Sequence, residues 1–345
     1  EVEIRNGDNI ETLTARSIII ATGARPFVPP IPGIEDMDIL TSDNLWELQD
    51  QPKRLVVLGG GPIGCELAQT FARLGSQVMQ VEMLPRIMPR EDDDAAALVT
   101  ASLRDNGVDV LTEHKAVRFA REGDDKVLYV EHNGEEKRLV FDAVLVAVGR
   151  RANTDGLGLD ELNLPTNGNG TVTVNERLQS RYPNIYACGD VAGPYQFTHT
   201  AAHQAWYASV NALFGSLKSF AVDYRVIPWC TFTDPEVAHE VTRYGIDDLD
   251  RAIADSNDHG FVKVITAKSS DKILGVTIVG AGAGDLIAEY VLAMKHGLGL
   301  NKILGTIHIY PTMAEANKFA AGEWKKAHNP EGVLRWVERF HNWRR

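Results

Sequence analysis

Apolar residues gather in short runs that end close to a glycine, and the stretches between these runs have helical spacing. Runs at residues 53–58, 77–82 and 143–149 each predict a strand, because each is bounded by turn residues. A helical pattern follows the first run and continues to residue 74, with Gly75 as its expected C-terminal glycine, and a second fills residues 93–106. Residues 53–149 therefore predict a strand–helix–strand–helix unit.

A β-insertion is predicted inside this unit, because apolar residues 127–130 and 139–141 flank Asn133-Gly134, a pair typical of hairpin turns. Upstream, residues 1–24 predict a polar strand or hairpin and then a short buried strand that ends in glycine. The proline-rich residues 26–32 predict an extended surface connector, and residues 41–48 predict a short capped helix.

The remaining residues divide into two regions. Residues 150–222 predict loops, a short apolar run at 172–174, a strand at 185–188 and a helix over about 200–213. From residue 226 the pattern predicts a separate α+β domain, with strands at 261–266 and 273–279 and helices at 285–295 and 312–318. Residue 239 is expected to lead at once into the next strand.

Composition narrows the class of protein. The 345 residues are 44% hydrophobic and 24% charged, which fits a globular chain of two or three domains and excludes wholesale disorder. A net charge of -12 without a long basic run argues against nucleic acid as a partner. No apolar stretch reaches the roughly 20 residues of a membrane helix, and the first residues lack the zones of a signal peptide. A cytoplasmic location is the default expectation.

The three cysteines, Cys65, Cys188 and Cys230, lie far apart and form neither a CxxC nor a CxxxxC pair. Metal-type spacing with histidine is also missing from the sequence. We expect buried, reduced thiols and no metal site, with one bridge between distant cysteines as the alternative.

A glycine turn after the first run carries the clearest chemistry. It matches GxGxxG, and an acid, Glu82, ends the next predicted strand 18 residues past the third glycine. Glycine allows the tight turn and the close approach of a diphosphate to a helix N-terminus, while the carboxylate accepts ribose hydroxyls and repels a 2′-phosphate. The sequence therefore predicts NAD(H) binding, with NADP(H) disfavoured, by Gly59, Gly60, Gly61, Pro62, Ile63, Gly64 and Glu82. The alternative is a plain glycine turn beside a surface glutamate.

A second glycine run, at residues 280–284, also follows a predicted strand and opens a helix. Asp285 stands where the third glycine of the motif belongs, and its charge would oppose a phosphate. We expect this run to serve packing.

Five motifs in this order resemble the class I pyridine nucleotide–disulfide oxidoreductases. Residues 21–23 are similar to the family's first ATG element, and residues 59–66 to its NAD fingerprint. Residues 148–154 are similar to the second ATG-type element, residues 185–190 to the motif that closes the FAD site, and residues 309–315 to the HPTxxE segment. Members include mercuric reductase and dihydrolipoamide dehydrogenase.

The resemblance implies an α/β fold with Rossmann-like FAD and NAD(P) domains, the FAD domain being incomplete, and an α+β C-terminal dimerisation domain. The implied boundaries are 1–50 and 149–222 for FAD, 51–148 for NAD(P) and 223–345 for dimerisation. It implies FAD as the second cofactor and a homodimer as the assembly. The implied flavin-side residues are Thr22, Gly23, Gly149, Arg150, Gly189, Asp190, Gln196, Phe197, Thr198 and His199. His199 is equally well a structural histidine.

Four further residues take roles by resemblance alone. Val117 matches a position at the adenosine end of the dinucleotide, and Glu66 matches one that pairs with a flavin-side lysine not present here. Tyr310 replaces the histidine that shuttles a thiol proton, and Glu315 matches the glutamate that orients it. A phenol has a pKa near ~10, so Tyr310 is a poor base at neutral pH. A dimer contact is the alternative for this pair.

Three departures from the family pattern change the expected function. The family's initial FAD-binding GxGxxG and CxxxxC pair are missing, so we expect a piece of a longer protein whose chain alone is inactive. The loop and helix that normally follow residue 238 are expected to be missing too. Tyrosine at 310 favours the mercuric reductase branch, yet no cysteine follows Cys230 to capture the soft metal.

Three functional hypotheses follow from this pattern. The first is an FAD-dependent NAD(P)H oxidoreductase that acts on a disulfide or a related sulfur or metal-thiolate acceptor, with hydride passing from NADH to the flavin. The second is a soluble transhydrogenase or NADH:acceptor reductase that needs no cysteine pair. The third is a truncated, non-catalytic module that binds NAD and dimerises.

Overall fold

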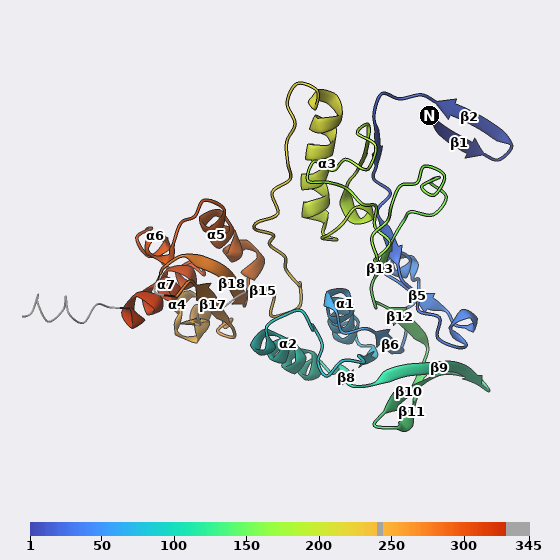
Figure 1. Ribbon diagram of the computed structural model, residues 1–345. Helices are drawn as coiled ribbons and strands as arrows, with labels where there is room; N and C mark the ends of the chain where they lie inside the picture. Colours follow the sequence, from blue (N-terminus) through green and yellow to red (C-terminus); the bar gives the residue numbers. More distant parts are fainter. Residues whose placement is uncertain (240–243, 269, 329–345) are drawn as a thin grey trace, which may run out of the picture. The chain divides into compact units, whose positions relative to one another are not determined.

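The structure is a computed structural model that describes residues 1–239, 244–268 and 270–328. Its internal contacts divide the chain into two units. The first comprises residues 1–29, 40–47 and 146–224, and the second comprises residues 30–39, 48–145 and 225–345. Figure 1 shows the helices and strands of both units.

The first unit is built from three two-stranded sheets and one long helix. Its strands are β1 (Val2–Asn6), β2 (Asn9–Leu13), β3 (Ile18–Ile20), β4 (Ala24–Pro26), β13 (Arg150–Ala152) and β14 (Ile185–Ala187). β1 pairs with β2 and β4 with β13, both antiparallel, while β3 and β14 are parallel. The helices are η2 (Leu45–Glu47), η3 (Gly189–Val191) and α3 (Thr198–Phe214).

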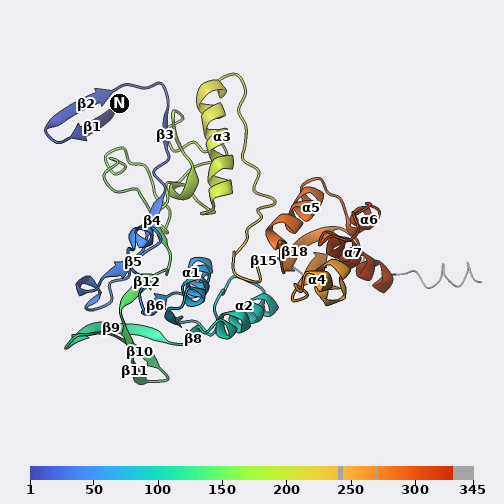
Figure 2. The ribbon, with the colours of Figure 1, turned by 180° about the vertical axis from the view of Figure 1, so that it is seen from behind.

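The second unit begins with the predicted α/β sheet. Its order is β5 (Ile39–Leu40), β12 (Ala143–Val146), β6 (Arg54–Leu58), β7 (Gln77–Val81) and β8 (Asp109–Leu111). β6, β7 and β8 are parallel. The helices are η1 (Ile34–Asp36), α1 (Pro62–Arg73) and α2 (Asp93–Asp105), and Figures 1 and 2 both show α1 and α2 beside this sheet. Leu55, Val56 and Val57 are fully buried, as a parallel sheet covered on both faces requires.

The predicted insertion is a three-stranded antiparallel sheet. It consists of β9 (Lys115–Glu122), β10 (Asp125–His132) and β11 (Glu135–Phe141). Asn133 and Gly134 have φ of 54° and 84°, the left-handed pair that a tight hairpin turn needs. The hairpin prediction is confirmed.

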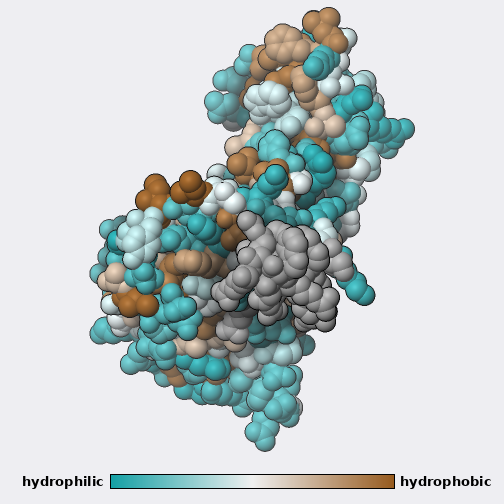
Figure 3. Space-filling view, turned by 90° about the vertical axis from the view of Figure 1, so that its left-hand side faces the viewer, coloured by the Kyte–Doolittle hydropathy of each residue, from teal (hydrophilic) through white to brown (hydrophobic). Residues whose placement is uncertain are grey.

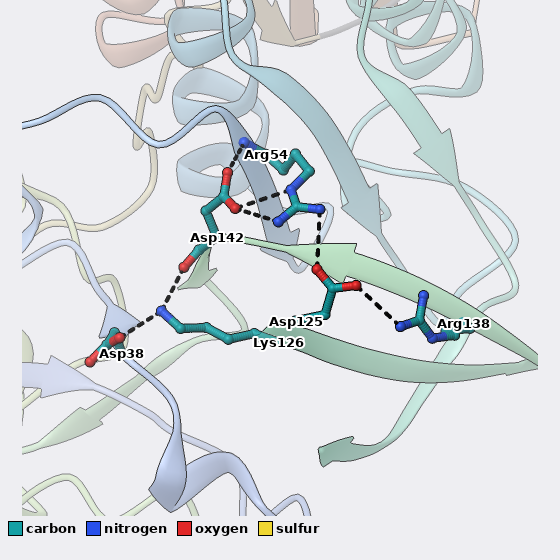
Figure 4. A network of polar contacts seen from close by, with 6 residues as sticks. All are labelled: Asp38, Arg54, Asp125, Lys126, Arg138 and Asp142. Carbon is teal, nitrogen blue, oxygen red and sulfur yellow. Dashed lines mark hydrogen bonds and ion pairs between the residues drawn. The ribbon is translucent and has the colours of Figure 1, made fainter. Parts of the chain in front are cut away.

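A charged network joins this insertion to the parallel sheet. Figure 4 shows its six members, Asp38, Arg54, Asp125, Lys126, Arg138 and Asp142. Arg54 on β6 donates to Asp142 at 2.6 Å and lies 3.6 Å from Asp125 on β10. The Arg54 guanidinium lowers the pKa of Asp142. A single exposed ion pair contributes at most about 1 kcal/mol to stability. Here several ion pairs form one network that connects the two sheets.

The C-terminal part of the second unit is a four-stranded sheet with helices. The sheet order is β15 (Val237–His239), β18 (Ile273–Val279), β17 (Phe261–Thr266) and β16 (Tyr244–Gly245). The helices are η4 (Ile246–Asp248), α4 (Asp250–Ala254), α5 (Ala283–Lys295), α6 (Leu300–Leu304) and α7 (Glu315–Ala327). Their apolar faces form one core with the sheet. The strands at 261–266 and 273–279 match the prediction residue for residue.

Two local predictions were met only in part. Residues 240–243 lie outside the described residues, so the strand expected directly after residue 239 stays a prediction; β16 begins at Tyr244, and η4 and α4 precede β17. The short capped helix expected at residues 41–48 is the 3-10 helix η2, and the Asn44 side chain accepts the Thr41 N–H ahead of it.

Two further predictions need smaller corrections. The last helix begins at Glu315 rather than 312 and continues to Ala327. β3 was expected to be buried, but its central residue Ile19 is 38% exposed, because β3 pairs only with β14 among the described residues.

The face of the molecule in Figure 3 carries mainly hydrophilic residues. Apolar side chains interrupt it in places, as the brown atoms in Figure 3 show on one face. Ile307 and Ile309, between α6 and α7, are 93% and 78% exposed. No helix among the described residues combines the length and apolar character needed to cross a membrane.

Candidate functional site

The glycine turn links β6 to α1 and leaves the helix N-terminus open. Gly59 has φ of 108°, which a side chain rarely adopts. Gly61 is the N-cap of α1, and no side chain caps the first N–H groups. A Cβ on Gly61 would meet nothing within 4 Å, whereas one on Gly64 would lie 2.1 Å from the Gly59 carbonyl oxygen. The turn thus combines open space before the helix with tight packing beneath it.

Glu82 follows β7 and lies against this turn. Its carboxylate is 8% exposed and accepts the Gly60 N–H at 2.7 Å and the Leu84 N–H at 2.8 Å. A carboxylate has about four acceptor positions, so two backbone bonds leave capacity for ribose hydroxyls. The sequence anticipated the position of Glu82 but missed its part in holding the turn.

These residues fit a dinucleotide. The uncapped N-terminus of α1 offers N–H groups and the positive end of the helix dipole to a diphosphate. Gly61 leaves room for that group, and Glu82 lies on the neighbouring strand, where ribose binds in such folds. This is the arrangement of the dinucleotide-binding α/β proteins.

Val117 lies on β9, half-buried, at a separate cavity of about 430 Å³. The cavity is lined by Pro30, Ile31, Pro32, Lys115, Ala116, Val117, Glu131 and Glu136. The chain just before β9 contacts the site, because the His114 N–H donates to the Glu82 carbonyl at 3.0 Å. The adenosine role of Val117 stays a prediction.

In the first unit, the two ATG-type elements lie side by side. The Thr22 hydroxyl donates to the Asn153 carbonyl at 2.7 Å, and the Asn153 amide returns a bond to the Thr22 carbonyl at 2.9 Å. Gly23 and Gly149 have φ of 69° and 137°, so both sit where glycine is preferred. The structure therefore brings these predicted residues together.

Arg150 connects that pair of elements to the predicted FAD-closing motif. Its guanidinium donates to the Ala24 carbonyl at 2.6 Å and to the Ser42 hydroxyl at 3.1 Å, and its Nε lies 3.6 Å from the Asp190 carboxylate. Asp190 is on η3, directly after β14, and its side chain is 20% exposed. A carboxylate there can still accept hydroxyl groups of a flavin side chain.

The loop after Asp190 leads to α3. Gly189 has φ of 78°, and its N–H donates to Gln204, which is fully buried and also donates to the Gly193 carbonyl at 2.8 Å. The sequence analysis did not identify Gln204. The signal that could have done so is a glutamine on the buried face of a helix. α3 begins at Thr198 with no side-chain cap, with Gln196, Thr198 and His199 exposed. The described residues fit the part of an FAD site that they would supply.

Glu66, on α1, was expected to face a flavin-side lysine. That lysine is not part of this chain, so the pairing stays a prediction; in the structure the Glu66 carboxylate accepts the Phe232 N–H at 2.8 Å. Burial raises the pKa of Glu66, and the bond from Phe232 opposes that rise. Within the described chain Glu66 therefore holds the segment that precedes β15.

Tyr310 and Glu315 are not hydrogen-bonded to each other. The Tyr310 hydroxyl donates to Asp250 at 2.8 Å, and Tyr310 is 67% exposed. Glu315 is 8% exposed and accepts the Thr312 N–H at 3.3 Å, so it serves the start of α7. The bond to Asp250 and that carboxylate's charge raise the pKa of Tyr310, which makes the phenol a still weaker base.

A histidine that sequence reasoning missed lies two residues before Tyr310. The His308 side chain is 6% exposed, with Nε2 3.0 Å from Glu289 and Nδ1 3.1 Å from the Thr306 carbonyl. Asn317 donates to the same carboxylate at 2.9 Å. Because both ring nitrogens are engaged, His308 anchors the loop and does not replace the missing proton-shuttling histidine.

All three cysteines are free thiols in the structure. Cys65 and Cys188 are buried, while Cys230 is half-buried. Burial raises the pKa of Cys65 and of Cys230 to about 12 and raises that of Cys188. Within residues 1–239, 244–268 and 270–328, no group of three or more His, Cys, Asp or Glu side chains could hold a metal ion.

The second glycine run is occupied by protein. Gly282 is the N-cap of α5, and the Glu236 carboxylate accepts the Gly284 N–H at 3.1 Å. A carboxylate from the chain itself fills the place where a phosphate would bind, in agreement with a packing role.

Comparison with known proteins identifies the family. The pyridine nucleotide-disulphide oxidoreductase model matches residues 1–205, and the dimerisation domain of the same family matches residues 227–321. The chain belongs to the pyridine nucleotide-disulphide oxidoreductases, whose members use FAD and NAD(P)H.

Individual relatives agree with this assignment. A mercuric reductase of Staphylococcus aureus is 35% identical over 92% of the chain and 60% of its own length. A dihydrolipoyl dehydrogenase of Thermus scotoductus is 35% identical over 93% of the chain and 72% of its own length. A copper(II) complex of the HOCl-induced flavoprotein disulfide reductase RclA of Escherichia coli superposes with a TM-score of 0.85 at 28% identity, over 93% of this chain and 75% of that one. The chain thus spans about 60% of the length of the mercuric reductase.

Proposed function

We propose that this chain supplies the NADH-binding, dimerising and part of the flavin-binding structure of an FAD-dependent NAD(P)H oxidoreductase. The proposal rests on the N-terminus of α1, which begins after Gly61 without a side-chain cap, and on Glu82, whose carboxylate accepts a backbone N–H of the same turn. NADH is the preferred coenzyme, because a carboxylate at this position repels a 2′-phosphate. We keep residues 51–148 as the NAD(P) domain, 1–50 with 149–222 as the FAD part, and 223–345 as the dimerisation domain.

Bound FAD would supply the redox chemistry, accepting a hydride from NADH and passing electrons onward. The residues of this chain would bind and orient. Asp190 would hold the hydroxylated flavin side chain, and Arg150 would keep that carboxylate in place. The N-terminus of α3 would stabilise negative charge on the flavin ring, because its first N–H groups have no side-chain cap.

The proposed acceptor class is a disulfide or a related sulfur or metal-thiolate compound. Relatives named mercuric reductase, dihydrolipoyl dehydrogenase and flavoprotein disulfide reductase support this class. The thiols of this chain do not serve as the redox pair in the proposal, because burial keeps them protonated. The pair would come from other residues of the protein.

The proposed assembly is a homodimer, supported by the match to a dimerisation domain. Ile307, Ile309 and Tyr310 are exposed large apolar or aromatic side chains of the loop that His308 anchors. In the dimer, Tyr310 would reach the partner's active site as a neutral hydrogen-bonding phenol. We also propose a cytoplasmic location, consistent with three unbridged cysteines.

One observation favours a second candidate, an NADH:acceptor reductase or transhydrogenase without a cysteine pair. Thiol chemistry in the first candidate needs a proton shuttle, and Tyr310, hydrogen-bonded to Asp250, is unsuited to that task at neutral pH. The third possibility, a non-catalytic module, would bind NADH and dimerise without turnover.

Calorimetry with NADH and NADPH, followed by NADH oxidation assays on the FAD-loaded protein, separates these candidates. Oxidation coupled to disulfide reduction supports the first, and oxidation only with a non-thiol acceptor or NADP⁺ supports the second. Binding without turnover leaves the module. If folded protein binds neither coenzyme, the proposed function fails.

A further inference from the structure

A fully buried glutamine lies beneath the glycine turn, at a position that is not part of the GxGxxG motif. Gln80 is in β7 and is 0% exposed. Its neighbours on both sides along the strand are apolar, and the fully buried sheet around it favours apolar side chains. An amide at this position therefore needs a reason other than burial.

Gln80 and Glu82 hold one peptide of the turn from both ends. The Gln80 Nε2 donates to the Gly59 carbonyl at 3.1 Å, while Glu82 accepts the N–H of the following residue, Gly60, at 2.7 Å. Residues two apart on a strand share a face, so both side chains point from the same side of β7 toward the turn. The peptide between Gly59 and Gly60 cannot rotate without breaking both bonds.

This restraint decides which backbone groups face the dinucleotide. The Gly60 carbonyl is already bound, accepting the Met88 N–H at 2.6 Å and lying 3.4 Å from the Cys65 sulfur. With the turn held in this way, its carbonyls are engaged by protein, and the first N–H groups of α1 remain for a diphosphate. A rotated Gly59–Gly60 peptide would direct a carbonyl oxygen, an acceptor, toward that anion.

The amide of Gln80 uses its nitrogen for the turn and leaves its oxygen without a partner within the described chain. Among the described residues, Gln80 Oε1 is buried without a hydrogen-bond partner. An unpaired buried carbonyl oxygen destabilises a fold, and an apolar side chain of similar length would in turn leave the Gly59 carbonyl without its donor. Features that oppose stability locally are expected where function demands them.

We propose that Gln80 is a positioning residue for dinucleotide binding, which holds the Gly59–Gly60 peptide in the binding-competent orientation. The inference rests on the proposed function, because it names how the same NADH site is kept in shape. It predicts that removing the amide frees the Gly59–Gly60 peptide and weakens NADH binding in a protein that stays folded.

The test is Gln80→Met in the intact protein, with Gln77→Met as the matched control. Methionine fills a similar volume without a donor or an unpaired oxygen, and Gln77 is exposed on the same strand. Three quantities are measured: the melting temperature, the Kd for NADH by calorimetry, and the hydrogen exchange of peptides covering residues 58–62 without ligand.

For Gln80→Met we expect a folded protein whose melting temperature changes little, because one unpaired acceptor, Gln80 Oε1, is exchanged for another, the Gly59 carbonyl oxygen. We also expect faster exchange at the turn and a Kd about 5- to 10-fold weaker, the range that one buried hydrogen bond supports. Gln77→Met should match the wild type in all three. A Gln80→Met protein with wild-type Kd and exchange overturns the proposal. So does a lower melting temperature with unchanged Kd, which would make Gln80 an ordinary core residue.

Failure of the proposed function gives a different result. In that case the wild-type protein does not bind NADH, and the exchange measurement alone decides whether Gln80 holds the turn. Faster exchange in Gln80→Met but not in Gln77→Met then supports the restraint, and equal exchange refutes it.

Discussion

Replacement of Glu82 tests the electrostatic basis of coenzyme choice. The carboxylate is 8% exposed and lies 2.7 Å from the Gly60 nitrogen, so its charge is held at the turn and poorly screened. Two like charges about 4 Å apart repel by roughly 4 kcal/mol at an effective dielectric constant near 20. Allowing for partial solvation, we expect Glu82 to disfavour NADPH by about 2–4 kcal/mol, or roughly 30- to 1,000-fold in Kd.

Glu82→Ala should therefore bring the ratio of the NADPH and NADH Kd values close to one. It should also weaken NADH binding itself, because ribose hydroxyls lose a charged acceptor, a contact that contributes about 1.5–3 kcal/mol. The substitution leaves the N–H groups of Gly60 and Leu84 unpaired, so the protein should also be less stable. Glu82→Gln separates the effects, because the amide keeps one acceptor oxygen without the charge.

Calorimetric titration with each coenzyme measures the ratio, and thermal unfolding confirms that the variants are folded. Glu113→Gln is the control, since it removes an exposed charge close to the same edge of the sheet, where the Glu113 N–H donates to the Leu84 carbonyl. Glu113→Gln should leave the ratio unchanged. If both Glu82 variants retain the wild-type ratio while folded, the carboxylate does not select the coenzyme and the reasoning is wrong.

Three further predictions concern other parts of the chain. Gly61→Ala should keep the free energy of unfolding within about 0.5 kcal/mol, because its Cβ enters only the open space before α1. The same Cβ occupies the space proposed for the diphosphate, so NADH affinity should fall more than about tenfold. Gly64→Ala should instead unfold at a markedly lower temperature, since its Cβ would lie 2.1 Å from a carbonyl oxygen. Absorbance titration should show that Tyr310 ionises above the usual phenol range, and Asp250→Asn should lower its pKa. A change of reaction rate with pH near neutrality that disappears in Tyr310→Phe would contradict the assignment of Tyr310 as a neutral phenol. Cys230, with a pKa raised to about 12, should stay protonated at pH 8 and react much more slowly with an aromatic disulfide reagent than it does in the unfolded chain; fast reaction of native protein would refute this.

The pattern of apolar positions anticipated most elements of both α/β regions. β17 and β18 have the predicted limits, and the turn at Asn133 and Gly134 is where the dipeptide indicated. These features depend on local spacing and on φ preferences, which a residue has regardless of its distant neighbours. Where burial depended on a partner strand, as for Ile19 on β3, the local pattern misled.

The pattern of apolar positions could not predict which side chains bind to each other. The sequence suggested Glu315 as the residue that orients Tyr310, but the tyrosine donates to Asp250, 60 positions earlier in the chain. Likewise, nothing in the spacing marked His308 as the partner of Glu289. Such pairs depend on how separate elements pack, and periodicity encodes only which face of an element is buried.

By itself, the sequence determined that a glycine-rich turn joins a buried strand to a helix and that an acid closes the neighbouring strand. These are consequences of chain-local geometry, because only glycine tolerates that turn and an apolar run of that length must be buried. Only the tertiary structure decided what holds the turn. The amide of Gln80 and the carboxylate of Glu82 meet the Gly59–Gly60 peptide because parallel pairing of β6 and β7 aligns residues more than 20 positions apart, and no local preference specifies that register.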